Sequence, residues 1–162
     1  MEWPWSEVRS EERGTTARAF AVLLLVTAAH TLAETARDAL FLARLSPSRL
    51  PWVYLGLAVL GGLLGVRKKG VTSSARLAGM IAVASVVTAG FAVALRGPSL
   101  ALVYALYAWT GVCASVLTVE LWVLLGRLHT ATQAKRLYGL VGSGAVLGAV
   151  VGSATSRALA AA

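Results

Sequence analysis

The feature that most constrains this chain is a series of apolar stretches, each about as long as a lipid bilayer is thick. A helix that crosses the hydrocarbon core needs about 20 mostly apolar residues. Hydrophobic residues make up 57% of the 162-residue sequence and charged residues 14%, which excludes an ordinary water-soluble globular domain. The predicted spans cover about residues 17–43, 48–66, 76–95, 99–126 and 138–160.

We therefore expect an all-α protein, a polytopic membrane helix bundle with about five transmembrane helices, formed by residues 17–162. Residues 1–16 are expected to form a cytoplasmic amino-terminal tail. The segments between the spans contain proline, glycine and charged residues, which are typical of turns and loops. The polar stretch at residues 127–136 is assigned to the fourth connection, between the fourth and fifth spans.

The distribution of basic residues predicts the orientation of the chain. Most of the 15 Lys and Arg residues lie in the tail, the second connection and the fourth connection, which would share one side of the membrane. Because basic residues near the ends of spans stay in the cytoplasm, we expect a multi-pass protein of the inner (plasma) membrane with a cytoplasmic amino terminus. The net charge of +8 is explained in this way, and no nucleic-acid partner is expected.

Four polar residues lie on one face of the first predicted span: His30, Glu34, Arg37 and Asp38. A charge at the bilayer centre costs roughly 3 kcal/mol or more, so this face cannot point at lipid. Two interpretations stay open. In one, the residues form an internally neutralised cluster in which Glu34 or Asp38 pairs with Arg37. In the other, they line a water-filled pathway in which Arg37 binds an anion such as a phosphate or a carboxylate.

The sequence does not predict an enzyme. It contains no nucleophile–base set and no phosphate-binding loop, so no catalytic residues and no cofactor are expected. His30 alone makes a poor metal ligand, and we expect it to be a hydrogen-bonded histidine of the helix bundle. The single Cys113 excludes an intrachain disulfide.

Glu120 is the second unusual charge, and it lies on the fourth predicted span. One interpretation is a carboxylate that takes part in proton coupling or gating. The other is a carboxylate near the cytoplasmic interface, paired with Arg127 or with basic residues of the connections. A direct ion pair with Arg37 is not expected, because the predicted depths of the two residues differ by about 15 Å.

Two predicted spans carry glycines at a spacing of four residues. These are Gly61 and Gly65 in the second span, and Gly144, Gly148 and Gly152 in the fifth. This spacing places small residues on one helix face and lets another backbone approach closely. We expect helix packing at these faces; a sliding surface of a transporter is the alternative.

Two segments resemble the ATP:ADP antiporter family, which comprises nucleotide transporters of plastids and intracellular bacteria and many bacterial relatives with unassigned substrates. The first segment is Glu34–Leu42, followed by Leu50–Leu55. The second is Gln133–Gly142, which is similar to the fourth connection and the start of the fifth helix in that family. It includes Lys135, Arg136 and Tyr138, a predicted cytoplasmic motif.

The resemblance implies a major-facilitator-like fold of about twelve helices in two halves, with the substrate bound between them. It implies that Arg37 takes the place of a basic residue implicated in nucleotide transport, and that Asp38 matches an aspartate of the same motif. Glu34 and Thr35 replace the Arg-Asp pair that begins this motif, which weakens the case for a polyanionic substrate. In a register without gaps, the family's transport glutamate falls near Thr110 and not at Glu120.

These observations predict the amino-terminal part of a transporter that moves a nucleotide such as ATP or ADP, or another organic anion, across the inner membrane. We expect this chain alone to be inactive. Its expected partners are the lipid bilayer and either the missing carboxy-terminal half or a second copy of the chain. The alternative is a non-transporting membrane module of the same fold that acts as an anchor or sensor.

Overall fold

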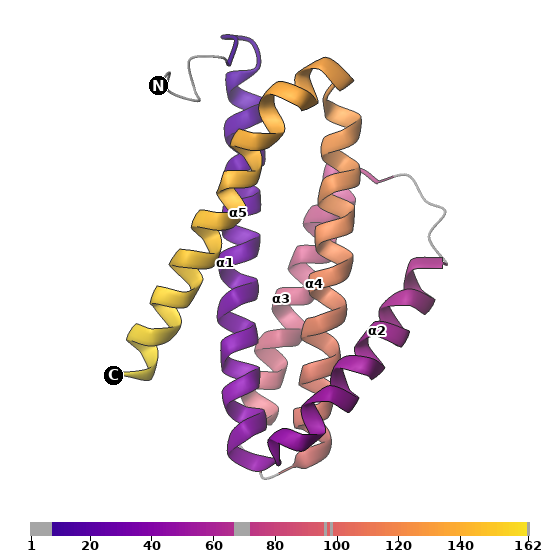
Figure 1. Ribbon diagram of the computed structural model, residues 1–162, viewed down its shortest axis with the longest axis vertical. Coiled ribbons are helices and arrows are strands. Elements are labelled where there is room, and N and C mark those ends of the chain that lie inside the picture. The colour runs from indigo at the N-terminus through magenta and orange to yellow at the C-terminus, as the bar shows by residue number, and fades with distance from the viewer. Residues whose placement is uncertain (1–7, 67–71, 96, 98, 162) are drawn as a thin grey trace. The chain divides into compact units, whose positions relative to one another are not determined.

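The computed structural model describes residues 8–66, 72–95, 97 and 99–161, and helices make up nearly all of this part of the chain (Figure 1). The helices are α1 (Arg13–Arg44), the short 3-10 helix η2 (Pro47–Arg49), α2 (Leu50–Val66), α3 (Ser74–Ala94), α4 (Leu100–Leu128) and α5 (Ala131–Ala160). Among the described residues, α1, α3, α4 and α5 are long and apolar enough to cross a membrane. The predicted fold class, an all-α polytopic membrane helix bundle, is confirmed.

The second predicted span corresponds to α2, which is shorter than the others. Its 17 residues extend for about 25 Å, which is near the lower limit for crossing the hydrocarbon core. α2 ends at Val66, directly before residues 67–71, which lie outside the described part of the chain. A membrane crossing by α2 therefore stays a prediction.

The start of the fifth span differs from the prediction. α5 begins at Ala131, so most of the polar residues assigned to the fourth connection are helical, and only His129 and Thr130 separate α4 from α5. The cause is a capping box. The hydroxyl of Thr130 accepts a hydrogen bond from the backbone N–H of Gln133 at 3.4 Å, and the side-chain oxygen of Gln133 accepts one from the backbone N–H of Thr130 at 2.9 Å.

The other helix boundaries also follow from local chemistry. α1 begins at Arg13, so the last residues of the predicted tail are helical. Pro47 begins η2 and Pro51 lies in the first turn of α2, where a missing N–H costs no helical hydrogen bond. The hydroxyl of Ser73 caps α3 by accepting a hydrogen bond from the backbone N–H of Arg76 at 3.2 Å.

The chain divides into two compact units. Unit 1 contains Met1–Thr35 and Leu125–Ala162, so its helices are the first part of α1, the last turn of α4 and all of α5. Unit 2 contains Ala36–Leu124, with the last turns of α1, all of α2 and α3, and most of α4. The contacts described below each lie within one of these units.

In unit 1, three glycines let α5 pack directly on the backbone of α1 (Figure 1). A Cβ atom built at Gly144 would lie only 2.7 Å from the carbonyl oxygen of Phe20. Cβ atoms at Gly148 and Gly152 would meet the carbonyl oxygens of Leu24 and Ala28 in the same way, one helical turn further along each time. All three glycines are buried, and no larger residue would permit this approach.

The glycines of α2 differ from those of α5. A Cβ atom built at Gly61 meets nothing within 4 Å, so Gly61 packs against no described residue and its expected packing role stays a prediction. The physical reason is that this part of α2 lies at the surface, with Val59 57% exposed and Leu63 64% exposed. The surroundings of Gly65 lie outside the described residues.

In unit 2, an aromatic core joins the end of α1 to α2 and α4. Its buried members are Phe41, Leu45, Val103 and Tyr107. The ring of Phe41 meets the ring of Tyr107 edge-on, with 5.3 Å between the ring centroids. Such edge-to-face pairs are stabilising beyond the area that they bury.

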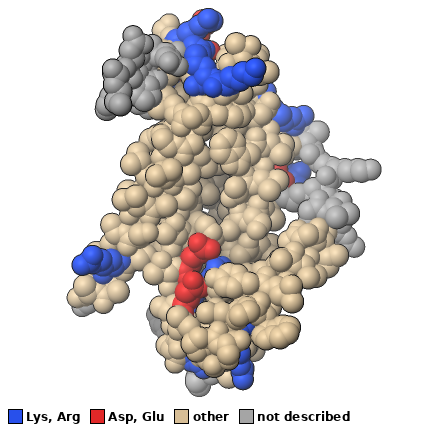
Figure 2. Space-filling view, viewed as in Figure 1, with Lys and Arg blue, Asp and Glu red and all other residues tan. Residues whose placement is uncertain are grey.

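The surface of the chain is largely apolar. Most of the face visible in Figure 2 is uncharged, and large apolar side chains such as Trp52, Val86 and Leu25 are mostly exposed. In water, apolar patches of this extent would be an aggregation hazard. In a bilayer they face lipid, so the surface agrees with the membrane location that the apolar helices indicate.

The glycine contact in unit 1 generates a stability prediction. Gly148→Ala would force a methyl group against the backbone of α1, so we expect a loss of about 1–3 kcal/mol of stability, measured by thermal unfolding in detergent. Gly142→Ala is the matched control, since a Cβ atom there meets nothing within 4 Å. Alanine favours a helix over glycine, so the control should be neutral or slightly stabilising. Equal effects of the two substitutions would contradict the close α1–α5 contact.

Candidate functional site

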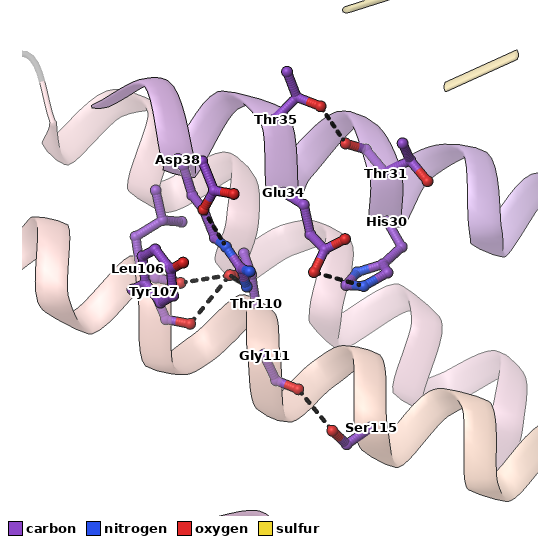
Figure 3. Close-up of polar contacts among 11 residues, drawn as sticks. His30, Thr31, Glu34, Thr35, Asp38, Leu106, Tyr107, Thr110, Gly111 and Ser115 are labelled. Carbon is purple, nitrogen blue, oxygen red and sulfur yellow. Dashed lines mark hydrogen bonds and ion pairs between the residues drawn. The ribbon is translucent and has the colours of Figure 1, made fainter. Parts of the chain in front are cut away.

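The strongest candidate site in unit 2 surrounds Arg37. This residue lies on α1, and its side chain is only 3% exposed. The guanidinium donates from Nε to Oδ1 of Asp38 at 3.2 Å, and from Nη1 to Oγ1 of Thr110, on α4, at 3.1 Å. Thr110 in turn donates to a backbone carbonyl one turn earlier on α4, that of Leu106 at 2.9 Å (Figure 3). Arg37 therefore forms an ion pair within α1 and links α1 to α4 through the Thr110 hydroxyl.

Tyr107 forms the second part of this site. The Arg37 guanidinium lies over the Tyr107 ring, with Cζ 4.1 Å from the ring centroid, in a cation–π contact. Tyr107 is fully buried, and its hydroxyl oxygen makes no hydrogen bond to any described residue. The ring of Tyr54 meets the ring of Tyr107 edge-on, with 5.9 Å between the ring centroids. A buried phenol normally has a hydrogen-bond partner, so this hydroxyl is an unusual unsatisfied group among the described residues.

The polar face predicted on α1 is present as two pairs, one in each unit. In unit 2, Asp38 pairs with Arg37, which is one of the two pairings that the sequence left open. In unit 1, Nε2 of His30 lies 3.3 Å from Oε1 of Glu34, and both side chains are partly exposed (Figure 3). The described residues contain no group of three or more His, Cys, Asp or Glu that could hold a metal ion.

Glu120, also in unit 2, has partners from the start of α3. Its side chain is buried, with Oε2 accepting a hydrogen bond from the hydroxyl of Thr72 and Oε1 lying 3.5 Å from Nη2 of Arg76. Arg76 lies in the first turn of α3, where the second connection ends, so this geometry corresponds to the interpretation of a paired carboxylate. Sequence reasoning did not identify Thr72, because a threonine in a connection gives no signal of its long-range partner.

The predicted cytoplasmic motif lies at the start of α5 in unit 1. Nη2 of Arg136 donates to both carboxylate oxygens of Glu12, at 2.7 and 2.6 Å, and Nε2 of Gln133 donates to one of them at 2.9 Å. The ring of Tyr138 meets the ring of His129 edge-on at 5.9 Å, and Lys135 is exposed.

Glu12 is a residue that the sequence interpretation missed. It is only 7% exposed and ties the segment before α1 to the start of α5. The hydrogen bond from Gln133 lowers the pKa of Glu12 below its ordinary value, and the backbone N–H of Arg9 and the charge of Arg136 lower it further, although desolvation opposes them. The sequence signal for this ion pair was the acidic Glu12 in the tail together with the basic residues of the fourth connection.

Comparisons with known proteins assign no family to the chain. No family model matches it, and no curated protein or solved structure is similar enough to count as a match. The functional argument therefore depends on the geometry of the residues described above.

The Glu12 contacts predict a pH dependence. Because the pKa of Glu12 is lowered in the folded state, its contribution to stability is complete near neutral pH. It is lost as the pH falls below about 4 and the carboxylate is protonated. We expect Glu12→Gln to unfold at a lower temperature than the wild type at pH 7, and this difference to shrink in acid. Glu11→Gln, at an exposed neighbour, should follow the wild type at every pH. A Glu12→Gln difference that does not change with pH would contradict this role.

The Glu120 contacts predict a coupling between two residues. Since Arg76 lies beside a buried carboxylate, removing either charge alone should destabilise the chain. We expect a double-mutant cycle of Arg76→Gln and Glu120→Gln, read by unfolding in detergent, to give a coupling of about 0.5–3 kcal/mol. Additive effects would show that the two side chains do not stabilise one another.

Proposed function

We propose that this chain is the amino-terminal part of a membrane transporter that moves a nucleotide or another organic anion across the inner membrane, with its amino terminus in the cytoplasm. The observation that carries the proposal is the buried Arg37 beside the Tyr107 hydroxyl, on two helices long enough to cross a membrane. A charged residue inside a membrane helix is costly, and residues of this kind commonly mark substrate pathways.

The chemistry of the site suits an anion. A guanidinium presents planar N–H donors that match the oxygens of a phosphate or a carboxylate. The phenol of Tyr107 adds a further donor beside it. An anion that accepts from both groups would satisfy the Tyr107 hydroxyl, for which no described residue provides a hydrogen bond.

Asp38 explains how such a site stays neutral when it is empty. Its carboxylate balances the charge of Arg37, and its side chain is 40% exposed while that of Arg37 is 3% exposed. The partly exposed Asp38 can turn away and give up the Nε donor, whereas the buried guanidinium keeps its place over Tyr107. An entering anion would therefore replace Asp38 as the counter-charge of Arg37.

The family resemblance also supports a role of Arg37 in transport. Arg37 takes the place of the basic residue that the resemblance implicates in nucleotide transport. Thr110 lies near the place of that family's transport glutamate, and the two side chains are hydrogen-bonded here. In proteins of this kind the substrate binds between two helical halves. We therefore expect transport only when this chain assembles with further helices or with a second copy.

The test is ligand-dependent stability of the full chain in detergent, with ATP, ADP or inorganic phosphate added. A ligand at ten times its Kd should stabilise the wild type by about 1.4 kcal/mol, which raises Tm by about 3–6 °C. Arg37→Gln should abolish the shift, and Tyr107→Phe should reduce it because the donor is lost while the ring stays.

Arg157→Gln is the control for a general loss of positive charge, since Arg157 is an exposed arginine in the last turn of α5. It should keep the full shift. If none of these anions stabilises the wild type, or if Arg37→Gln responds as the wild type does, the anion site is wrong. The chain would then be better described as a non-transporting anchor or sensor module.

A further inference from the structure

A second site lies in unit 1 and shares no residue with the Arg37 cluster of unit 2. It is a cavity of about 560 Å³ between the segment that precedes α1 and the first turns of α5. Its lining residues are Arg9, Glu12, Thr130, Thr132, Gln133, Lys135 and Arg136. Both α1 and α5 are long and apolar enough to cross a membrane, and the cavity is at the end where both begin. It would therefore lie close to a membrane surface.

The cavity is basic. Three cations line it against one carboxylate, that of Glu12, which Arg136 and Gln133 already engage. In the part of the chain that the structure describes, the guanidinium of Arg9 and the ammonium of Lys135 have no ion-pair partner. Figure 2 shows Lys and Arg side chains gathered over the end where α1 and α5 begin. The lining therefore has a surplus of positive charge that no described carboxylate balances.

The positive charge of the cavity comes from side chains and not from free backbone N–H groups at the amino terminus of α5. The capping box of Thr130 and Gln133 already occupies the backbone N–H groups of these two residues at the start of α5. Two hydrogen bonds to Glu12 hold the Arg136 guanidinium in place in the cavity lining. The groups left to bind a ligand are the exposed cations of Arg9 and Lys135, together with the Thr132 hydroxyl of the same lining.

We propose that this cavity binds the phosphate of an anionic phospholipid headgroup. A phospholipid brings a phosphate to the depth at which membrane helices end, and basic pockets between such helices bind anionic headgroups. The phosphate oxygens would accept hydrogen bonds from Arg9, Lys135 and Thr132, while the acyl chains stay in the bilayer beside the apolar turns of α1. The negative charge of Glu12 repels a phosphate from the side of the cavity where Arg136 lies. The phosphate would therefore bind next to Arg9 and Lys135.

The test is the binding of phosphatidylglycerol and phosphatidylcholine to the full chain, titrated in detergent and read by native mass spectrometry and by thermal stability. We expect phosphatidylglycerol to bind more tightly than phosphatidylcholine. Arg9→Gln and Lys135→Gln should each weaken its binding about fivefold, and the two together about thirtyfold. Lys135→Arg should keep the affinity, and Arg157→Gln, at the other end of α5, should bind as the wild type does.

Three outcomes would overturn the proposal: equal binding of the two lipids, unchanged phosphatidylglycerol binding by the double variant, or displacement of the lipid by low-millimolar inorganic phosphate. The last would assign the cavity to a free anion. Arg9 and Lys135 are exposed, so their variants should fold. If the double variant does not fold, the phosphatidylglycerol affinity of Lys135→Gln alone tests the proposal. The site shares no residue with the Arg37 cluster, so failure here leaves the proposed transport function standing.

Discussion

A charge inside the hydrocarbon of a membrane must find its counter-charge within the protein, and the structure of unit 2 depends on this constraint. Arg37 is held by Asp38, Thr110 and the face of Tyr107, which ties the end of α1 to α4. Glu120 is held by Thr72 and Arg76, which ties the start of α3 to α4. Each charge therefore fixes a helix contact, and the pairing that makes it tolerable also positions a polar site between apolar helices.

Unit 1 is held together differently. Gly144, Gly148 and Gly152 bring the backbone of α5 against that of α1, a contact that depends on the absence of side chains. At the end of this contact, Glu12 and Arg136 add an ion pair with two short hydrogen bonds. Close backbone packing works within the membrane, where no hydrophobic effect drives helices together, and the ion pair works at its edge. The basic cavity follows from this ion pair, which holds Arg136 in its wall.

Much of the fold could be predicted from the sequence, because the length of an apolar run and the spacing of polar residues are local properties. The four long helices and the polar face of α1 are of this kind. The start of α5 differs from the prediction because the stretch is as polar as a loop, although Thr130 and Gln133 form the capping signal of a helix start. The long-range partners of Glu12, Arg37 and Glu120 could not be predicted, since each lies far away in the chain: Arg136, Thr110 and Thr72. The glycines of α2 and α5 share the same spacing, yet only those of α5 meet a neighbouring helix among the described residues.

The central claim is that α1 crosses the membrane with Arg37 turned toward protein and away from lipid. Spin labels placed singly at residues 36–42 of a Cys113→Ala chain in lipid vesicles would measure this directly, through collisions with oxygen, which concentrates in lipid, and with a water-soluble nickel chelate. The account predicts oxygen accessibility that oscillates with the helical period, with minima at Arg37 and Phe41, which are buried, and maxima at Ala39 and Leu42, which are exposed. High nickel accessibility along the whole segment, or an oxygen maximum at position 37, would contradict it.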